Sequence, residues 1–293
     1  MVANIKTKED FFGSIGMALS CTLFLEGALK EYKKYADLVD PDTISVISEW
    51  NKVLISLLQN NKYHFVLGYV GNSLIDGSRR FRNYIQKCIE CAPDVNVQSL
   101  HYVLRFQENM RFLDAKYNIN KNLCLCDLGC GLSPLVVLMQ TKYNLQKVYA
   151  IDVIPEICDL YNNAAYKFCG KMPTFIDWKT AQTKSTGIDT ITSVGCLPHM
   201  PIESQKEYMK IINKKFPNFF LEIKYKKSCN LNNSENAFSL QDLQKLRVDV
   251  QNVTDIEMAM IRNSLRYLHK FVCAKPDRRD FLVNQSRSLF LCR

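Results

Sequence analysis

The residues with the clearest chemical potential form a short segment, residues 127–131, that reads Asp-Leu-Gly-Cys-Gly. An apolar run precedes Asp127, and an apolar segment follows Pro134. Gly129 and Gly131 permit a tight turn and let a ligand approach the backbone. Pro134 suits the first turn of a helix, where its missing N–H costs nothing. The segment therefore predicts a strand, a ligand-binding turn and a helix.

A second acid, Asp152, ends the next apolar run of the chain and follows Gly131 by 21 residues. This is about where a Rossmann-like fold places the carboxylate that binds ribose hydroxyls. Pro134 replaces the third glycine of a dinucleotide-binding loop, which argues against NAD. Asp127 would repel a pyrophosphate but attract the ammonium and sulfonium groups of S-adenosylmethionine (SAM). The ligand predicted here is cationic.

These positions resemble the class I SAM-dependent methyltransferases, whose first motif has the form Asp-x-Gly-x-Gly. The resemblance covers residues 121–293 and implies SAM as cofactor. It places Asp127, Gly129 and Gly131 at the methionine end and Asp152 at the ribose, and Val153 is a further candidate cofactor-binding residue. Asp177 and Trp178 resemble the acid and neighbour that family members place at the adenine. Gly195, in the segment 189–201, belongs to a strand and turn that resemble those facing the transferred methyl group.

Methyl transfer from a sulfonium is an in-line displacement that depends on desolvation and orientation, so a strong base is optional. If a base is needed, His199 is the first candidate, with Tyr225 and Glu108 as weaker ones. No pair of aspartates stands at the end of the expected fourth strand, so no metal is expected. Lys224, Lys226 and Lys227 follow the expected fifth strand and indicate an anionic acceptor.

Each of these residues also has a purely structural interpretation. The two glycines could form an ordinary strand–helix turn. Asp177 could be a helix N-cap, and Trp178 could be part of the core. His199 could be a structural histidine in a turn, and the lysines could be a solvated charge run.

The acceptor is open at this stage. A small organic molecule is favoured, but residues 130–135 (Cys-Gly-Leu-Ser-Pro-Leu) resemble the aminoglycoside-resistance ribosomal RNA methyltransferases. The stretch from His101 to Arg105 lacks most of that family's pattern. The Gly-x-Gly-x-x-Pro-Leu loop also resembles nicotianamine synthase-like enzymes, which transfer an aminopropyl group. A non-catalytic SAM-binding module is a further alternative.

The elements that must position these residues follow from hydrophobic periodicity. We predict an α/β fold for residues 121–293, with a Rossmann-like, mostly parallel sheet and helices on both faces. Residues 237–268 have a helical pattern and could wall a substrate pocket. The expected strands lie near 122–128, 146–151, 173–176, 188–194, 217–224 and 286–292, and the expected helices near 134–143, 154–168 and 202–214.

Residues 1–120 have a helical pattern and are predicted to form an all-helical N-terminal accessory domain. Asp42 is the expected N-cap of the second helix. The expected helices lie near 8–36, 43–60, 75–91 and 96–117.

Composition narrows the class of protein. The 293 residues are 47% hydrophobic and 23% charged, which excludes a disordered or fibrous chain. The net charge of +9 lies mainly in residues 205–293, which hold 17 Lys and Arg against 9 Asp and Glu, while residues 1–120 are nearly neutral at 14 against 13. A basic RNA-binding module at the front is therefore disfavoured, and nucleic acid is the less favoured partner.

Twelve cysteines without a secretory leader favour reduced thiols and a cytoplasmic location. No second ligand pair completes a zinc site with Cys88 and Cys91. The most apolar stretch, residues 11–25, is too short to span a membrane.

Overall fold

A parallel sheet organises the chain. The computed structural model describes residues 40–59, 63, 107, 109–111, 113–114, 117, 119–194, 196–197, 200–224 and 288–292, with the backbone alone for residues 224 and 288–292. The strand order is β3-β2-β1-β4-β5-β6; the first five strands are parallel, and β6 runs antiparallel to β5. The strands are β1 (Cys124–Leu128), β2 (Lys147–Ile151), β3 (Thr174–Phe175), β4 (Thr190–Ser193), β5 (Asn218–Lys224) and β6 (Ser288–Cys292).

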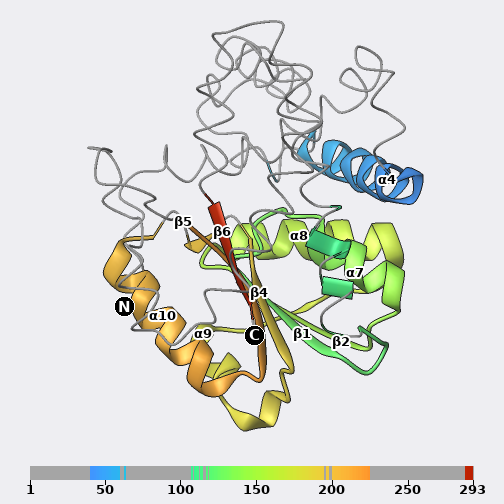
Figure 1. Cartoon of the computed structure of the whole chain (residues 1–293). Coiled ribbons are helices and arrows are strands. Elements are labelled where there is room, and N and C mark those ends of the chain that lie inside the picture. Colours follow the sequence, from blue (N-terminus) through green and yellow to red (C-terminus); the bar gives the residue numbers. More distant parts are fainter. Residues whose placement is uncertain are drawn as a thin grey trace, which may run out of the picture.

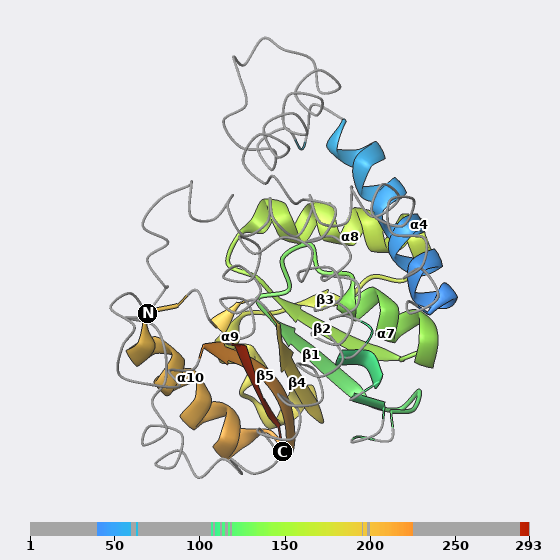
Figure 2. The ribbon, with the colours of Figure 1, turned by 45° about the horizontal axis from the view of Figure 1, so that its top comes forward.

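Helices cover both faces of this sheet (Figure 1). On one face lie α7 (Leu135–Tyr143) and α8 (Pro155–Cys169), with α4 (Pro41–Leu58) packed on both of them (Figure 2). On the other face lie α9 (Trp178–Ala181) and α10 (Ile202–Lys215), and a short 3-10 helix, η2 (Lys184–Thr186), precedes β4. The predicted Rossmann-like, mostly parallel sheet with helices on both faces is confirmed.

The N-terminal prediction is only partly covered. Of its four expected helices, the structure describes α4 and several helical residues between 107 and 117. The segments 8–36 and 75–91 lie outside the described residues, and so does the expected helical segment 237–268.

Two apolar clusters, one on each face, hold the sheet to its helices. Strands β1 and β4 are buried along their whole length, as expected for central strands of a parallel sheet that is covered on both faces, although three of the four β4 residues are Thr or Ser. Side chains alternate along β1, so Leu125 packs toward α7 and α8, while Cys126 packs toward α10. The α4 side chains Ile47, Trp50 and Leu54 belong to the same cluster as Leu125. Helix α4 is therefore continuous with the core on that face.

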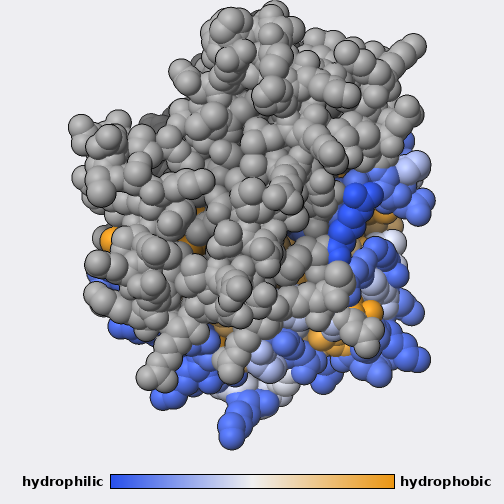
Figure 3. All heavy atoms as spheres, in the orientation of Figure 1, coloured by the Kyte–Doolittle hydropathy of each residue, from blue (hydrophilic) through white to orange (hydrophobic). Residues whose placement is uncertain are grey.

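The outer surface of the described part is mostly hydrophilic in the view of Figure 3, with small apolar patches. Among the described residues, no helix combines the length and the apolar composition needed to cross a membrane. The apolar stretch 11–25 lies outside these residues.

The N-cap of α4 is Asp40, and the prediction of Asp42 is wrong. The Asp40 side chain accepts hydrogen bonds from the Thr43 backbone N–H (3.1 Å) and the Thr43 hydroxyl (2.8 Å). Pro41 occupies the first helical position, where its fixed φ is favourable, so the helix begins two residues earlier than expected. Asp42 lies in the first turn instead.

This assignment can be tested with two matched substitutions. Asp40→Ala removes the cap and is expected to lower the free energy of unfolding by about 1 kcal/mol. Asp42→Ala removes only a charge near the positive end of the helix dipole and is expected to cost a few tenths of a kcal/mol. Urea unfolding at pH 7 measures both values. Equal destabilisation by the two variants would contradict the assignment of Asp40 as the cap.

Candidate functional site

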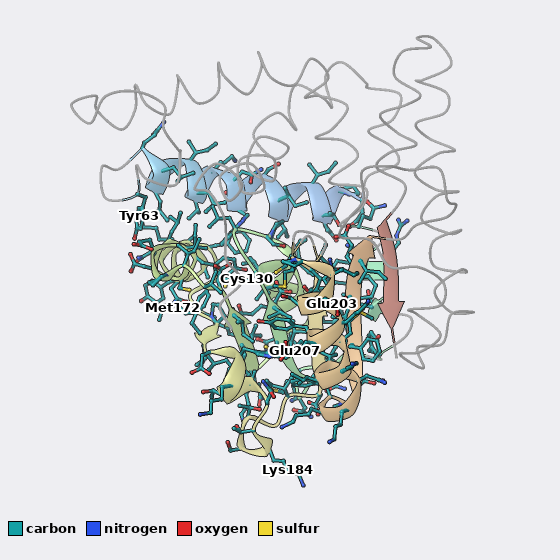
Figure 4. All side chains as sticks on the ribbon, turned by 90° about the vertical axis from the view of Figure 1, so that its left-hand side faces the viewer. Tyr63, Cys130, Met172, Lys184, Glu203 and Glu207 are labelled. Atoms are coloured by element: carbon teal, nitrogen blue, oxygen red, sulfur yellow. The ribbon has the colours of Figure 1, made fainter. Side chains whose placement is uncertain are left out.

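The candidate site lies at the carboxyl ends of β1 and β4. The chain adds β2 and β3 on one side of β1 and then returns to place β4 and β5 on the other side. The gap between β1 and β4 is therefore the topological switch point, where open α/β sheets bind their ligands. Figure 4 shows Cys130, just after β1, at the same end of the sheet as α4, and Lys184 at the opposite end.

Both glycines after β1 adopt backbone conformations that favour glycine. Gly129 has φ of 69° and Gly131 has φ of 52°. A Cβ atom on Gly129 would lie 2.1 Å from the Cys196 sulfur, in the loop after β4. A Cβ atom on Gly131 would meet none of the described residues within 4 Å. Gly129 therefore joins two loops closely, whereas Gly131 makes no such close contact with the described residues.

Asp127 is a buried carboxylate in β1, with 3% of its surface exposed. It pairs in register with Thr192 of β4, and the Thr192 hydroxyl donates a hydrogen bond of 2.7 Å to Asp127 Oδ1. No other hydrogen bond to this carboxylate is formed within the described part of the chain. Burial raises the pKa of Asp127 to about 7, against the opposing effect of the Thr192 hydrogen bond.

Asp152 connects the loops that follow β1 and β2. One of its oxygens accepts the backbone N–H of Gly131 (3.0 Å), and the other accepts that of Ile154 (3.1 Å). Burial raises the pKa of Asp152, while these amide donors oppose the rise. Each carboxylate oxygen has a second lone pair, so Asp152 retains the capacity to accept hydroxyl donors from a ligand.

Val153 and the pair after β3 lie along the same edge of the sheet. The Val153 side chain is 57% exposed, an unusual position for a valine. Asp177 is exposed and caps α9, accepting hydrogen bonds from the Thr180 backbone N–H (2.7 Å) and hydroxyl (3.0 Å), which lower its pKa. The structural interpretation of Asp177 as an N-cap is thus confirmed.

Trp178 packs on the face of the sheet that carries α10. Its ring centroid lies 4.8 Å from that of Tyr208 and 6.1 Å from that of Phe216. The side chain is half-buried at the border of the cluster on that face. Part of the Trp178 side chain is therefore buried in the core, and the rest of its surface is exposed.

Four of the predicted site residues lie outside the described residues: Gly195, His199, Tyr225 and Glu108. The structure therefore brings together Asp127, Gly129, Gly131 and Asp152, with Val153 beside them.

Two neighbours of the site were not predicted from the sequence. Thr192 donates a hydrogen bond to the Asp127 carboxylate, and Cys196 packs against Gly129. The register of β1 against β4 is the signal that would have identified Thr192, because it places this residue directly opposite Asp127. Burial raises the pKa of the Cys196 thiol to about 12, so this side chain is a neutral packing group near pH 7.

Comparisons with known proteins give similarities at the level of solved structures. No protein-family model matches the sequence, and no curated protein matches it. The fold assignment rests on the strand order described above. Similar structures include magnesium protoporphyrin IX methyltransferase from Synechocystis PCC 6803 with bound SAM (19% identity, 67% of this chain and 82% of that chain covered, TM-score 0.38). They also include phosphoethanolamine N-methyltransferase 2 from Haemonchus contortus in complex with SAM (11% identity, 64% of this chain and 50% of that chain covered, TM-score 0.38). A third similar structure is that of a putative RNA methyltransferase from Pyrococcus horikoshii (17% identity, 43% of this chain and 60% of that chain covered, TM-score 0.34).

The close contact at Gly129 predicts unequal effects of alanine at the two glycines. Gly131→Ala imposes only the cost of a left-handed backbone, about 1–2 kcal/mol. Gly129→Ala adds an overlap with Cys196 and is expected to lower the free energy of unfolding by about 2 kcal/mol more. Urea unfolding of both variants measures the difference. A Gly129→Ala variant as stable as Gly131→Ala would show that the two loops do not touch.

The ionisation of Asp127 predicts a pH-dependent stability. A carboxyl group whose pKa is raised on folding stabilises the protein fully at low pH and loses this contribution as the pH rises through the folded value. Between pH 5 and pH 8, wild type should lose about 3 kcal/mol relative to Asp127→Asn, which keeps the Thr192 hydrogen bond but cannot ionise. Urea unfolding at several pH values measures both proteins. Parallel curves for the two would contradict a buried, titrating Asp127.

Proposed function

We propose that the chain is a SAM-dependent methyltransferase that transfers a methyl group in line to a small organic acceptor, without a metal. The observation that carries this proposal is a buried carboxylate, Asp127, beside two glycines with positive φ at the switch point of the sheet. A negative group at this place suits a ligand with an ammonium and a sulfonium and disfavours a pyrophosphate.

The residues of the site fit this cofactor in three ways. Within the described residues, Asp127 accepts a hydrogen bond at one oxygen, from Thr192, and its other oxygen could accept an ammonium donor. None of the described residues stands close to a Cβ position at Gly131, which permits close approach of a ligand to the backbone. Asp152 has remaining lone pairs for ribose hydroxyls, and the exposed Val153 offers an apolar surface beside it.

The pair of residues after β3 is our candidate for the part of the site that binds the adenine ring of SAM. We infer that Asp177 and Trp178 lie next to this ring, with Asp177 also serving as the cap of α9 and Trp178 also packing on Tyr208. Gly195 would face the transferred methyl group.

When bound, SAM supplies an electrophilic methyl group on a positively charged sulfur. The chain's own residues then have three tasks. They hold the cofactor, exclude water and align the acceptor for in-line attack. Any proton on the acceptor would pass to His199, with Tyr225 and Glu108 as further candidates. The sequence run from Lys224 to Lys227 favours an acceptor that carries negative charge. The six cysteines among the described residues are free thiols, which favours a reducing compartment such as the cytoplasm.

The products of turnover distinguish this proposal from its alternatives. The purified full-length chain is incubated with SAM and a small-molecule cell extract, and the nucleoside products are identified by mass spectrometry. S-adenosylhomocysteine (SAH) supports methyl transfer, and methylthioadenosine would instead indicate aminopropyl transfer. Methylation of added ribosomal RNA, but of no small molecule, would overturn the proposed acceptor class.

Cofactor affinity gives a residue-level prediction. Asp127→Asn removes the negative charge and keeps the shape, so we expect SAM to bind roughly 10 to 100 times more weakly. The matched control is Asp189→Asn. Asp189 accepts a hydrogen bond from the backbone N–H of Cys124, at the end of β1 opposite to Asp127, so this substitution removes a carboxylate away from the site. Isothermal titration calorimetry measures both affinities. If wild type binds NADH but neither SAM nor SAH, the proposal is wrong.

A further inference from the structure

Two buried aromatic side chains hold consecutive carbonyl groups of the loop after β1. The Trp50 indole N–H donates to the carbonyl oxygen of Leu132 (3.3 Å), and the Tyr161 hydroxyl donates to that of Ser133 (3.2 Å). Both side chains are fully buried. Their ring centroids lie 5.2 Å apart with the planes tilted by 56°. The two donors therefore form one packed unit against the loop.

These donors come from different parts of the chain. Tyr161 lies in α8, which follows β2, whereas Trp50 lies in α4, 82 residues before the carbonyl that it holds. Phe168 packs edge-on against Trp50 at 6.1 Å, and Phe175 packs edge-on against Tyr161 at the same distance. The surrounding aromatic rings leave Trp50 little freedom to leave the loop.

The same loop is also held by backbone and carboxylate groups. The backbone N–H groups of Gly129 and Cys130 donate to the carbonyl of Ile151, and that of Gly131 donates to Asp152. Trp50 and Tyr161 secure the carbonyls of the next two residues along the loop. Leu132 is 5% exposed, so its carbonyl would be left buried without a donor if the indole N–H were removed.

We propose that Trp50 and Tyr161 are positioning residues of the cofactor site and that α4 is part of that site through Trp50. This inference rests on the proposed function, because it identifies the loop as the one that binds SAM. Neither residue is assigned a contact with the ligand. Their effect is to keep the loop in the conformation that exposes Gly131 and orients Asp152.

Three variants separate this role from general stability. Trp50→Phe and Tyr161→Phe keep an aromatic ring but remove the donor, and each is expected to weaken SAH binding about tenfold, the effect of one lost buried hydrogen bond. Leu54→Ala removes a fully buried apolar side chain of the same helix, one that cannot hydrogen-bond to the loop. It is expected to lower stability yet keep SAH affinity within about twofold, since its effect is a cavity in the core.

A measurement on the wild-type chain adds a test that does not require the donor variants to fold. The sequence has two tryptophans, so a nitrogen-15 NMR spectrum shows two indole N–H signals. The Trp50 signal, identified with Trp178→Phe, is expected to shift on addition of SAH because its acceptor lies in the binding loop.

The outcomes are distinguishable. If wild type binds SAH while the Trp50 signal does not move and both donor variants bind normally, the positioning role is overturned and the proposed function stands. The positioning role is also overturned if Leu54→Ala weakens SAH binding as much as Trp50→Phe does. If wild type binds neither SAM nor SAH, the proposed function is wrong, and this inference is wrong with it.

Discussion

The structure depends on keeping a carboxylate inside the sheet at the end of β1. Removing a charged group from water costs several kcal/mol unless it is paired or protonated. Among the described residues, Asp127 accepts a hydrogen bond from Thr192. Its pKa is raised to about 7, so its protonated and ionised forms are nearly equal in free energy near neutral pH. A cationic ligand would tip this balance toward the charged form. The buried carboxylate is a cost to the empty protein that binding can offset.

Neighbouring groups hold the glycine loop beside Asp127 in one conformation. Asp152 holds the N–H side of the glycine loop, and Trp50 and Tyr161 hold its carbonyl side. Gly129 lets the loops after β1 and β4 touch through Cys196. Held from these sides, the loop does not have to become ordered when a ligand arrives, which reduces the entropic cost of binding.

Much of this arrangement could be predicted from the sequence, because most strands of this sheet are short, mainly apolar runs, whereas β4 has only Ile191 as an apolar residue. All six expected strands are present, and Asp127 and Asp152 lie at the carboxyl edge as predicted. The cap of α4 was misplaced because Asp40 and Asp42 flank Pro41, and the pattern alone does not tell which acid precedes the first turn. Thr192 and Trp50 could not be predicted, since their roles follow from strand register and from a contact across 82 residues.

The distance in sequence between Trp50 and its acceptor also matters during synthesis of the chain. Helix α4 leaves the ribosome well before the loop and the helices that cover it. Until α7 and α8 have emerged, its face with Ile47, Trp50 and Leu54 has no partner from these helices. These side chains then lack the partners among α7 and α8 that bury them in the folded protein, and apolar surface left unburied is what chaperones bind and what promotes aggregation. The translation interval between α4 and α8 is therefore a period in which this part of the core is incomplete.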